Sequence, residues 1–292
     1  DILAITRLMN QGVRVSCLNR ETKVDGRTFD PGTFMILRNR NDATLDAFLS
    51  KELVGMDVHP IKSSFPDSGR QGPGSESIRD LRQPKIGVVF GEGDSPTSYG
   101  SAWYLLDNRF RLPFTAITKS TLNSGATGYS VIICPSGSYD APTERLKEWI
   151  QQGGCLILLE QSRLSSEKAF MPLESKETGS IPGSIFLAQL NRDYPLAYGH
   201  SRSEFAVPVG GSRHWKVAGV GGAVVELSEK TRGLTGWFWP DESERDMKGT
   251  TWMHDQPIGR GRVVSFAQDP TERAMWPGLH KLFLNSILLG AR

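Results

Sequence analysis

The amino-acid sequence predicts an α/β protein built on a doubly wound, mainly parallel sheet. Three apolar runs of strand length, "KIGVVFG", "YSVIICP" and "CLILLEQ", are bounded by glycine, proline or polar residues, as expected of parallel strands that are covered on both faces. Between them, "SYGSAWYLLDNRF" and "PTERLKEWIQQ" carry apolar residues at helical spacing. This order of strand, helix and strand is typical of a parallel sheet with helices on both faces.

Residues 1–61 predict a small α/β unit in front of that sheet. Residues 2–11 have helical spacing, and the following "GVRVSCL" alternates like a strand. A second strand is expected at Thr33–Leu37, after a proline-glycine turn. Asp42 is a candidate N-cap for a helix over "ATLDAFLSKEL", and "GMDVHPI" reads as a short strand beyond it.

Residues 62–83 are rich in Ser, Gly, Pro and charge and are expected to form a linker. The main α/β domain is then expected over residues 84–292. From Pro182 the sequence changes to short strand-like pieces with many glycine and aromatic residues, which we interpret as a β-rich insertion or sheet extension. The stretches "GRVVSFAQDP" and "LHKLFLNSILL" predict a last strand and a closing helix.

Composition argues against nucleic-acid and membrane partners. The 292 residues include 34 basic and 32 acidic side chains, a net charge of +2, so the sequence has no basic footprint for a polyanion. The longest apolar runs, such as Val131–Cys134 and Cys155–Leu159, are far shorter than a membrane span. The chain opens without Met, a basic segment or an apolar signal core, and we interpret it as a fragment whose targeting information lies upstream.

Cysteine and histidine spacing predicts neither disulfides nor a metal site. Cys17, Cys134 and Cys155 are an odd number in apolar contexts and are expected to be buried free thiols. The five histidines form no His-x-x-x-His or His-x-x-Glu pair, and Cys-x-x-Cys does not occur. No cofactor is therefore expected in this chain.

The candidate site lies beyond the carboxyl ends of the predicted strands, where open α/β sheets form their ligand crevice. The polar residues placed there are Glu92, Asp94, Ser95, Tyr99, Ser136, Ser138, Glu160, Gln161 and Ser162. The alternative is a solvated polar rim without a ligand, which any such fold has.

Other motifs are weaker. "GEGDSP" follows a strand, but Pro96 stands where a dinucleotide loop needs its third glycine, and "GVGGAVVEL" precedes a strand and not a helix. Trp237, Trp239, Trp252 and Trp276 fall in the last sixty residues. They could form a carbohydrate or peptide platform, or pack in a core or domain interface.

Four blocks carry a family resemblance: "PKIGVVFGEGDSPTSYGSAWYLLDNRFRLPFTAIT", "YSVIICPSGSYDAPTERLKEWIQQGGCLILLE", "IPGSIFLAQLNRDYPLAYG" and "GRGRVVSFAQDPTERAMWPGLHKLFLNSILLGAR". Together they resemble the carboxyl-terminal region of large bacterial proteins of the zinc carboxypeptidase family. That region resembles the class I glutamine amidotransferase-like fold, a flavodoxin-like sandwich. The likeness spans residues 84–292 and, more faintly, residues 1–61.

The resemblance implies a periplasmic or extracellular parent protein, a zinc metallocarboxypeptidase whose upstream domain would be this chain's partner. Zinc would be bound there by a His-x-x-Glu pair and a later histidine. Since this chain has no His-x-x-Glu, zinc and peptide hydrolysis would belong to the upstream domain alone.

Class I amidotransferases also need a Cys in a Gly-x-Cys-x-Gly elbow and a late His-x-Glu. The elbow position here reads Leu159–Arg163 without Cys or Gly, and the late strand carries Gln268-Asp269-Pro270 where histidine is needed. Cys155 is placed at the entry of its strand, away from the elbow. We therefore expect the fold without its catalytic dyad.

Three functions follow as hypotheses. The first is a non-catalytic accessory domain that serves interdomain packing, oligomerisation (including a homo-oligomer) or substrate positioning. The second is an independent hydrolase that uses Glu160 with Ser136 or Asp94. The third is a carbohydrate-binding module that uses the late tryptophans. Glu160 itself is interpreted as a structural cap, and a role as general base is the alternative.

Overall fold

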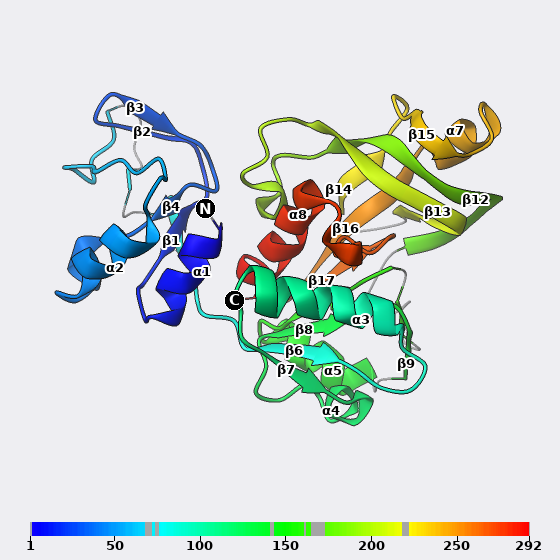
Figure 1. The fold of residues 1–292 in the computed structure, drawn as a ribbon, viewed down its shortest axis with the longest axis horizontal. Coiled ribbons are helices and arrows are strands. Elements are labelled where there is room, and N and C mark those ends of the chain that lie inside the picture. Colours follow the sequence, from blue (N-terminus) through cyan, green and yellow to red (C-terminus); the bar gives the residue numbers. More distant parts are fainter. Residues whose placement is uncertain are drawn as a thin grey trace. The chain divides into compact units, whose positions relative to one another are not determined.

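The computed structural model describes residues 2–67, 72–73, 76–140, 143–160, 162–164, 173–217 and 222–291. The chain divides into two compact units (Figure 1). The first comprises Asp1–Gln83 and Leu106–Pro113, and the second comprises Pro84–Leu105 and Phe114–Arg292. The segment 62–83, interpreted as a linker from its composition, is thus counted within the first unit and contributes a strand to it.

The first unit combines two helices with two small antiparallel sheets. Its elements are α1 (Ile2–Asn10), β1 (Ser16–Leu18), β2 (Thr22–Val24), β3 (Arg27–Phe29), β4 (Phe34–Met35), the 3-10 helix η1 (Arg38–Arg40), α2 (Leu45–Glu52) and β5 (Ile78–Asp80). Strand β1 lies between β4 and β5, and β2 pairs with β3 in a hairpin. Leu8, Val15 and Leu18 are buried in its core.

The second unit is organised around one mixed sheet of ten strands. They are β6 (Ile86–Val89), β7 (Phe114–Ile117), β8 (Val131–Cys134), β10 (Cys155–Leu158), β12 (Leu173–Leu190), β13 (Glu204–Val217), β14 (Gly222–Leu227), β15 (Gly233–Trp237), β16 (Thr250–Ile258) and β17 (Gly261–Phe266). A separate two-stranded sheet pairs β9 (Ser138–Tyr139) with β11 (Arg163–Leu164). The helices are α3 (Pro96–Trp103), α4 (Lys119–Asn123), α5 (Thr143–Gln151), α7 (Glu242–Met247) and α8 (Pro277–Leu288), with a π-helix η2 (Tyr104–Arg109) and 3-10 turns η3 (Pro195–Ala197) and η4 (Glu272–Ala274).

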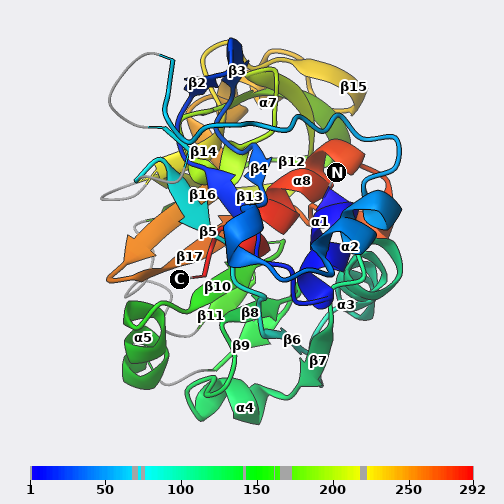
Figure 2. The same ribbon diagram turned by 90° about the vertical axis from the view of Figure 1, so that its left-hand side faces the viewer.

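Half of the sheet is parallel. Strands β7, β6, β8, β10 and β17 follow one another in that order with parallel pairing (Figure 2). Strands β6, β8 and β10 are buried at every position, which explains why they appear in the sequence as unbroken apolar runs.

The two faces of β10 are covered by different helices. Cys155 Sγ donates to the Ser286 carbonyl of α8 at 3.4 Å. Leu156 and Leu158 share a core cluster with Leu146 and other residues of α5. Because alternate residues of a strand face opposite sides, α8 and α5 lie on opposite faces of the strand. Cys155 is fully buried at the strand entry.

The other half of the sheet is antiparallel and partly closed. Strand β16 runs antiparallel to β17, and β12, β13, β14 and β16 pair in a ring: β13 with β12, β12 with β14, β14 with β16, and β16 with β13. These four strands form a small antiparallel barrel, built on the long β12–β13 hairpin that Figure 1 shows.

The predicted fold class is therefore wrong. A doubly wound, mainly parallel, flavodoxin-like or class I glutamine amidotransferase-like sheet would not contain an antiparallel half closed into a barrel. What sequence analysis treated as a β-rich insertion is half of the main sheet. Strand β12 runs for 18 residues and β13 for 14, but glycine, proline and two register shifts interrupt their alternation, so they read as short pieces.

Candidate functional site

The predicted crevice residues do gather at one edge of the sheet. Because β6, β8, β10 and β17 are parallel, the loops after their carboxyl ends meet there. These loops carry Asp94, Ser136, Glu160 and Asp269. Gln161, another predicted site residue, lies outside the described residues.

Asp94 forms a buried ion pair with Lys119. Its side chain is only 1% exposed, and one carboxylate oxygen lies 3.0 Å from Lys119 Nζ. Lys119 also donates to the backbone carbonyls of Glu92 at 2.6 Å and Ser138 at 3.1 Å. Lys119 thus links the loops that follow β6, β7 and β8, and the buried Asp94 carboxylate is paired with it.

A second network joins α3 to the loop after β17. Ser98 Oγ donates to Asp269 Oδ2 at 2.6 Å and accepts from the backbone N of Ser136 at 3.1 Å. Thr271 donates to Asp269 Oδ1 through its backbone N at 2.8 Å and its hydroxyl at 2.6 Å. Burial raises the pKa of Asp269, and the hydrogen bonds from Ser98 and Thr271 oppose that shift.

Glu160 is the most exposed of the central carboxylates. It follows β10 with a left-handed backbone, φ 47°, in the sharp turn where an α/β hydrolase would hold its nucleophile. Burial and the nearby charge of Asp269 raise the pKa of Glu160, Glu272 adds to this, and a hydrogen bond from the Ser136 side chain lowers it. Glu160 and Ser136 are thus in contact, as the hydrolase hypothesis requires.

The remaining predicted residues have local structural roles. Ser95 caps α3, accepting from Ser98 N at 3.3 Å. The ring of Tyr99 packs on Phe90, with ring centroids 4.6 Å apart. Ser162 is fully buried, and its hydroxyl lies 2.6 Å from the carbonyl oxygens of both Leu159 and Pro135. The hydroxyl of Ser162, which is buried and bonded to backbone carbonyls, is therefore not a free nucleophile.

Sequence reasoning did not select Ser98, Lys119 and Thr271, and it considered Asp269 only as the place of a missing histidine. A usable signal was present for Lys119 and Asp269, because each follows a strand whose carboxyl end reaches this edge. Ser98 lies in the first turn of α3 and is 171 residues away from its partner Asp269, so nothing local indicated it.

The described ranges contain no cluster of metal-binding side chains. Within them, no group of three or more His, Cys, Asp or Glu side chains could hold a metal ion. Nor does any described helix combine the length and the apolar character that crossing a membrane demands.

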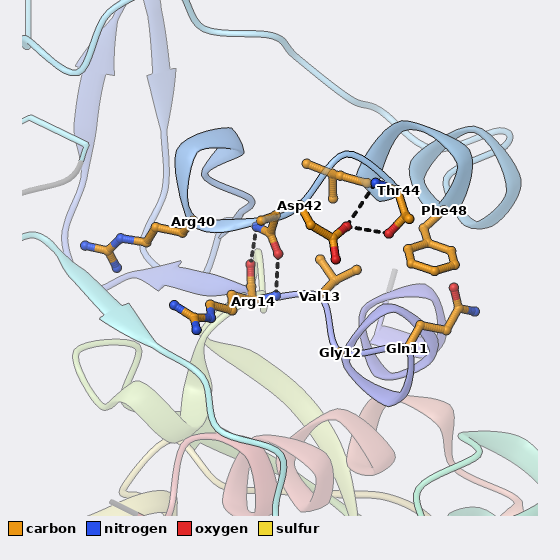
Figure 3. A pocket seen from close by; sticks show the side chains of 10 residues that line it. Gln11, Gly12, Val13, Arg14, Arg40, Asp42, Thr44 and Phe48 are labelled. Atoms are coloured by element: carbon orange, nitrogen blue, oxygen red, sulfur yellow. Dashed lines mark hydrogen bonds between the residues drawn. The ribbon is translucent and has the colours of Figure 1, made fainter.

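A separate cavity lies within the first unit, between the end of α1 and the start of α2. It measures about 250 Å³, and its walls include Gln11, Val13, Arg14, Arg40, Asp42 and Phe48. Figure 3 shows Arg14 and Arg40 extending to one side, Gln11 and Phe48 at the other end, and Asp42 between them. No motif in the sequence indicated this cavity.

The four late tryptophans do not form one cluster. Trp252 is buried, with an exposed fraction of 1%, and donates its ring N–H to the Pro208 carbonyl at 2.8 Å. Trp237 and Trp239, in contrast, are 81% and 59% exposed. Between these two, Phe238 turns inward and packs edge-on against Phe186 at 5.3 Å.

Comparisons with known proteins assign no family. No family model and no curated protein sequence matches the chain. Solved structures show distant likeness: a β-galactosidase from Bacillus circulans sp. alkalophilus has a TM-score of 0.48 and 14% identity, over 70% of this chain and 30% of that one. A cytoplasmic protein from Salmonella typhimurium has a TM-score of 0.45 and 13% identity over 71% and 99%. A ThuA-like protein from Parabacteroides merdae has a TM-score of 0.46 and 11% identity over 70% and 89%.

The chain thus matches less than a third of the length of that β-galactosidase. With TM-scores below 0.5 and identities between 11% and 14%, these likenesses assign neither a family nor an activity to the chain.

Proposed function

We propose that this chain is a non-catalytic accessory region of a larger protein of the zinc carboxypeptidase type, serving interdomain packing, oligomerisation or substrate positioning. Zinc and the peptidase residues would belong to an upstream domain. This proposal rests on the sequence resemblance for its parent and on the strand-end networks for its lack of catalysis.

One observation supports a structural role for this edge most strongly: the hydroxyl of Ser98 both donates to Asp269 and accepts from Ser136 N. A nucleophilic serine needs a base that accepts its proton and a free approach for the substrate. Asp269 accepts the proton of Ser98, but Ser98 is only 3% exposed, so its hydroxyl lacks a free approach for a substrate. Asp94 is equally committed to Lys119.

A test of the parent is the coding sequence upstream of this chain in the same reading frame. We expect a His-x-x-Glu pair followed by a distant histidine. An upstream region that encodes no such zinc ligands would contradict the carboxypeptidase parent.

The hydrolase hypothesis is tested with the purified chain, by assaying ester, amide and peptide substrates with and without added zinc. We expect no turnover above a heat-inactivated control. If turnover appears and is abolished by both Glu160→Gln and Ser136→Ala, while Glu92→Gln retains it, the chain is an enzyme and the accessory role is wrong.

A second candidate function is glycan binding through β15. Trp237 is the last residue of β15 and Trp239 lies two residues beyond it; both rings are exposed, while Phe238 between them packs against Phe186. Among the described strands, β15 pairs with β12 alone, so no described strand pairs with its other edge. Exposed tryptophans offer flat apolar faces with a polar N–H, which suits stacking against sugar rings.

This candidate is tested by affinity electrophoresis in gels that contain soluble polysaccharides. We expect at least one polysaccharide to retard the wild type, and Trp237→Ala and Trp239→Ala to remove the retardation. Met275→Ala, which trims a 57% exposed apolar side chain elsewhere, is the matched control and should behave as wild type. Equal migration of wild type and both tryptophan variants on every polysaccharide would exclude this function.

A further inference from the structure

We propose that the cavity of the first unit binds a short zwitterionic peptide of dipeptide size, with its carboxylate at Arg14, its ammonium group at Asp42 and an apolar side chain against Phe48. This goes beyond the accessory role, because it assigns a ligand to residues 11–48, which form no part of the strand-end crevice.

The size of the cavity limits the ligand. Its volume of about 250 Å³ lies below the roughly 300–1,000 Å³ that is usual for sites of drug-sized ligands. A free dipeptide is a small molecule whose two charged ends are separated by several bonds. This separation matters because Figure 3 shows the guanidinium of Arg14 on one side of the cavity and the carboxylate of Asp42 farther along it.

Arg14 supplies an available cation. Its backbone is fixed, since its N donates to Asn41 Oδ1 at 2.8 Å and its carbonyl accepts from Asn41 Nδ2 at 3.2 Å. Within the described residues, its guanidinium has no hydrogen-bond or ion-pair partner. Arg40 differs, because it gives two hydrogen bonds, at 2.9 and 3.0 Å, to Asp80. Arg14 is therefore the group left to bind a carboxylate, for which a guanidinium offers two parallel donors.

Asp42 supplies a fixed anion. Its Oδ1 accepts from the backbone N of Thr44 at 2.9 Å and from the Thr44 hydroxyl, and these bonds lower the pKa of Asp42. The side chain is thus ionised at neutral pH, and Oδ2 is left to accept from a ligand. Gln11 and Gly12 follow the last residue of α1, so the negative end of that helix also favours an ammonium group here.

The apolar residues at the end of the cavity opposite Arg14 favour a ligand with an apolar side chain. Phe48 is half-buried, and Val13 and Leu45 are buried beneath the same cavity. Figure 3 places the Phe48 ring at the end opposite Arg14. A first residue with a branched apolar side chain would cover this ring while its ammonium group meets Asp42.

The test uses leucyl-glycine as the probe, with its N-acetyl form, which lacks the ammonium, and its amide, which lacks the carboxylate. Binding to the full chain is followed by ligand-detected NMR titration. We expect saturable binding of leucyl-glycine and at least about tenfold weaker binding of each analogue, because each has lost one charge-assisted contact.

Variants assign the two ends. Arg14→Gln should weaken leucyl-glycine about tenfold or more and leave the amide unchanged, while Asp42→Asn should weaken leucyl-glycine and leave the N-acetyl form unchanged. Asn at position 42 can still accept from Thr44, so the fold should be kept. Arg82→Gln, an exposed arginine of the same unit outside the cavity, is the control and should bind as wild type.

Three outcomes would overturn the proposal. They are absence of saturable leucyl-glycine binding, equal binding by wild type and Arg14→Gln, and inorganic phosphate that binds Arg14 as tightly as the dipeptide does. None of them depends on the strand-end crevice, so the accessory role can fail or stand separately.

Discussion

Replacement of Asp269 by alanine tests whether the strand-end network is structural. The substitution removes the acceptor of three hydrogen bonds, from Ser98 Oγ and from the N and Oγ1 atoms of Thr271. Thr271 is fully buried, so its donors would lose their partner without gaining water. A buried unsatisfied donor costs about 1–3 kcal/mol, and relief of the buried charge offsets part of this. We expect a net loss of about 2–4 kcal/mol in the free energy of unfolding.

Urea unfolding followed by tryptophan fluorescence measures this loss cleanly, because all seven tryptophans lie in the second unit. Glu272→Ala, at an exposed neighbouring carboxylate, should change stability by less than about 0.5 kcal/mol. Since burial raises the pKa of Asp269, its contribution is fully present below the pKa of the unfolded state and declines as pH rises through the folded pKa. A loss below about 1 kcal/mol at low pH would refute the structural interpretation and make Asp269 a new candidate site residue.

Three further predictions concern the same unit and the thiols. In native protein at neutral pH, no cysteine should react with a thiol reagent within minutes, because Cys17, Cys134 and Cys155 are buried and burial raises the pKa of Cys17 to about 11; fast labelling of Cys155 would contradict this. Gly154→Ala should lower the free energy of unfolding in urea by about 1–3 kcal/mol, because the added Cβ would lie 2.4 Å from the Trp149 ring. Gly100→Ala, which has open space around it in α3, should instead stabilise the protein by about 0.5–1 kcal/mol. Equal effects of the two substitutions would show that the Trp149 ring moves to accommodate the added Cβ. Glu160→Gln should be more stable than wild type at pH 7.5 and lose that advantage in acid, since the pKa of Glu160 is raised and its ionised form is the disfavoured one; a destabilised Glu160→Gln at pH 7.5 would restore the cap interpretation.

How much could be predicted from sequence differs between local and distant features. The strands β6, β8 and β10 were predictable because each is a short apolar run that stays buried along its whole length. The gathering of Asp94, Ser136 and Glu160 was predictable too, because the ends of parallel strands coincide.

What could not be predicted depends on pairings between distant segments. The ring of β12, β13, β14 and β16 joins strands between residues 173 and 258, and their alternation is interrupted. The periodicity of hydrophobic residues within one strand does not predict which distant strand it pairs with. In the same way, the interpretation of Glu160 as a cap for backbone or arginine donors stays a prediction, and sequence analysis did not foresee its described neighbours, the Ser136 side chain and the carboxylates of Asp269 and Glu272. Cys155, at a strand entry, could be placed because its position depends on one element only.

The barrel also affects the edge of the sheet at which the rule for open sheets places a ligand crevice. In an open sheet, the loop after the last parallel strand is free to line a ligand site. Here that loop is fastened on both sides: Gln268 Nε2 donates to the Gly210 carbonyl of β13 at 3.2 Å, while Asp269 is bound by Ser98 of α3. The Ala267 N–H is also taken by the Trp252 carbonyl of β16 at 2.8 Å. Because β16 and β13 belong to the barrel, these bonds hold the loop after β17, within the described residues, between the barrel and α3.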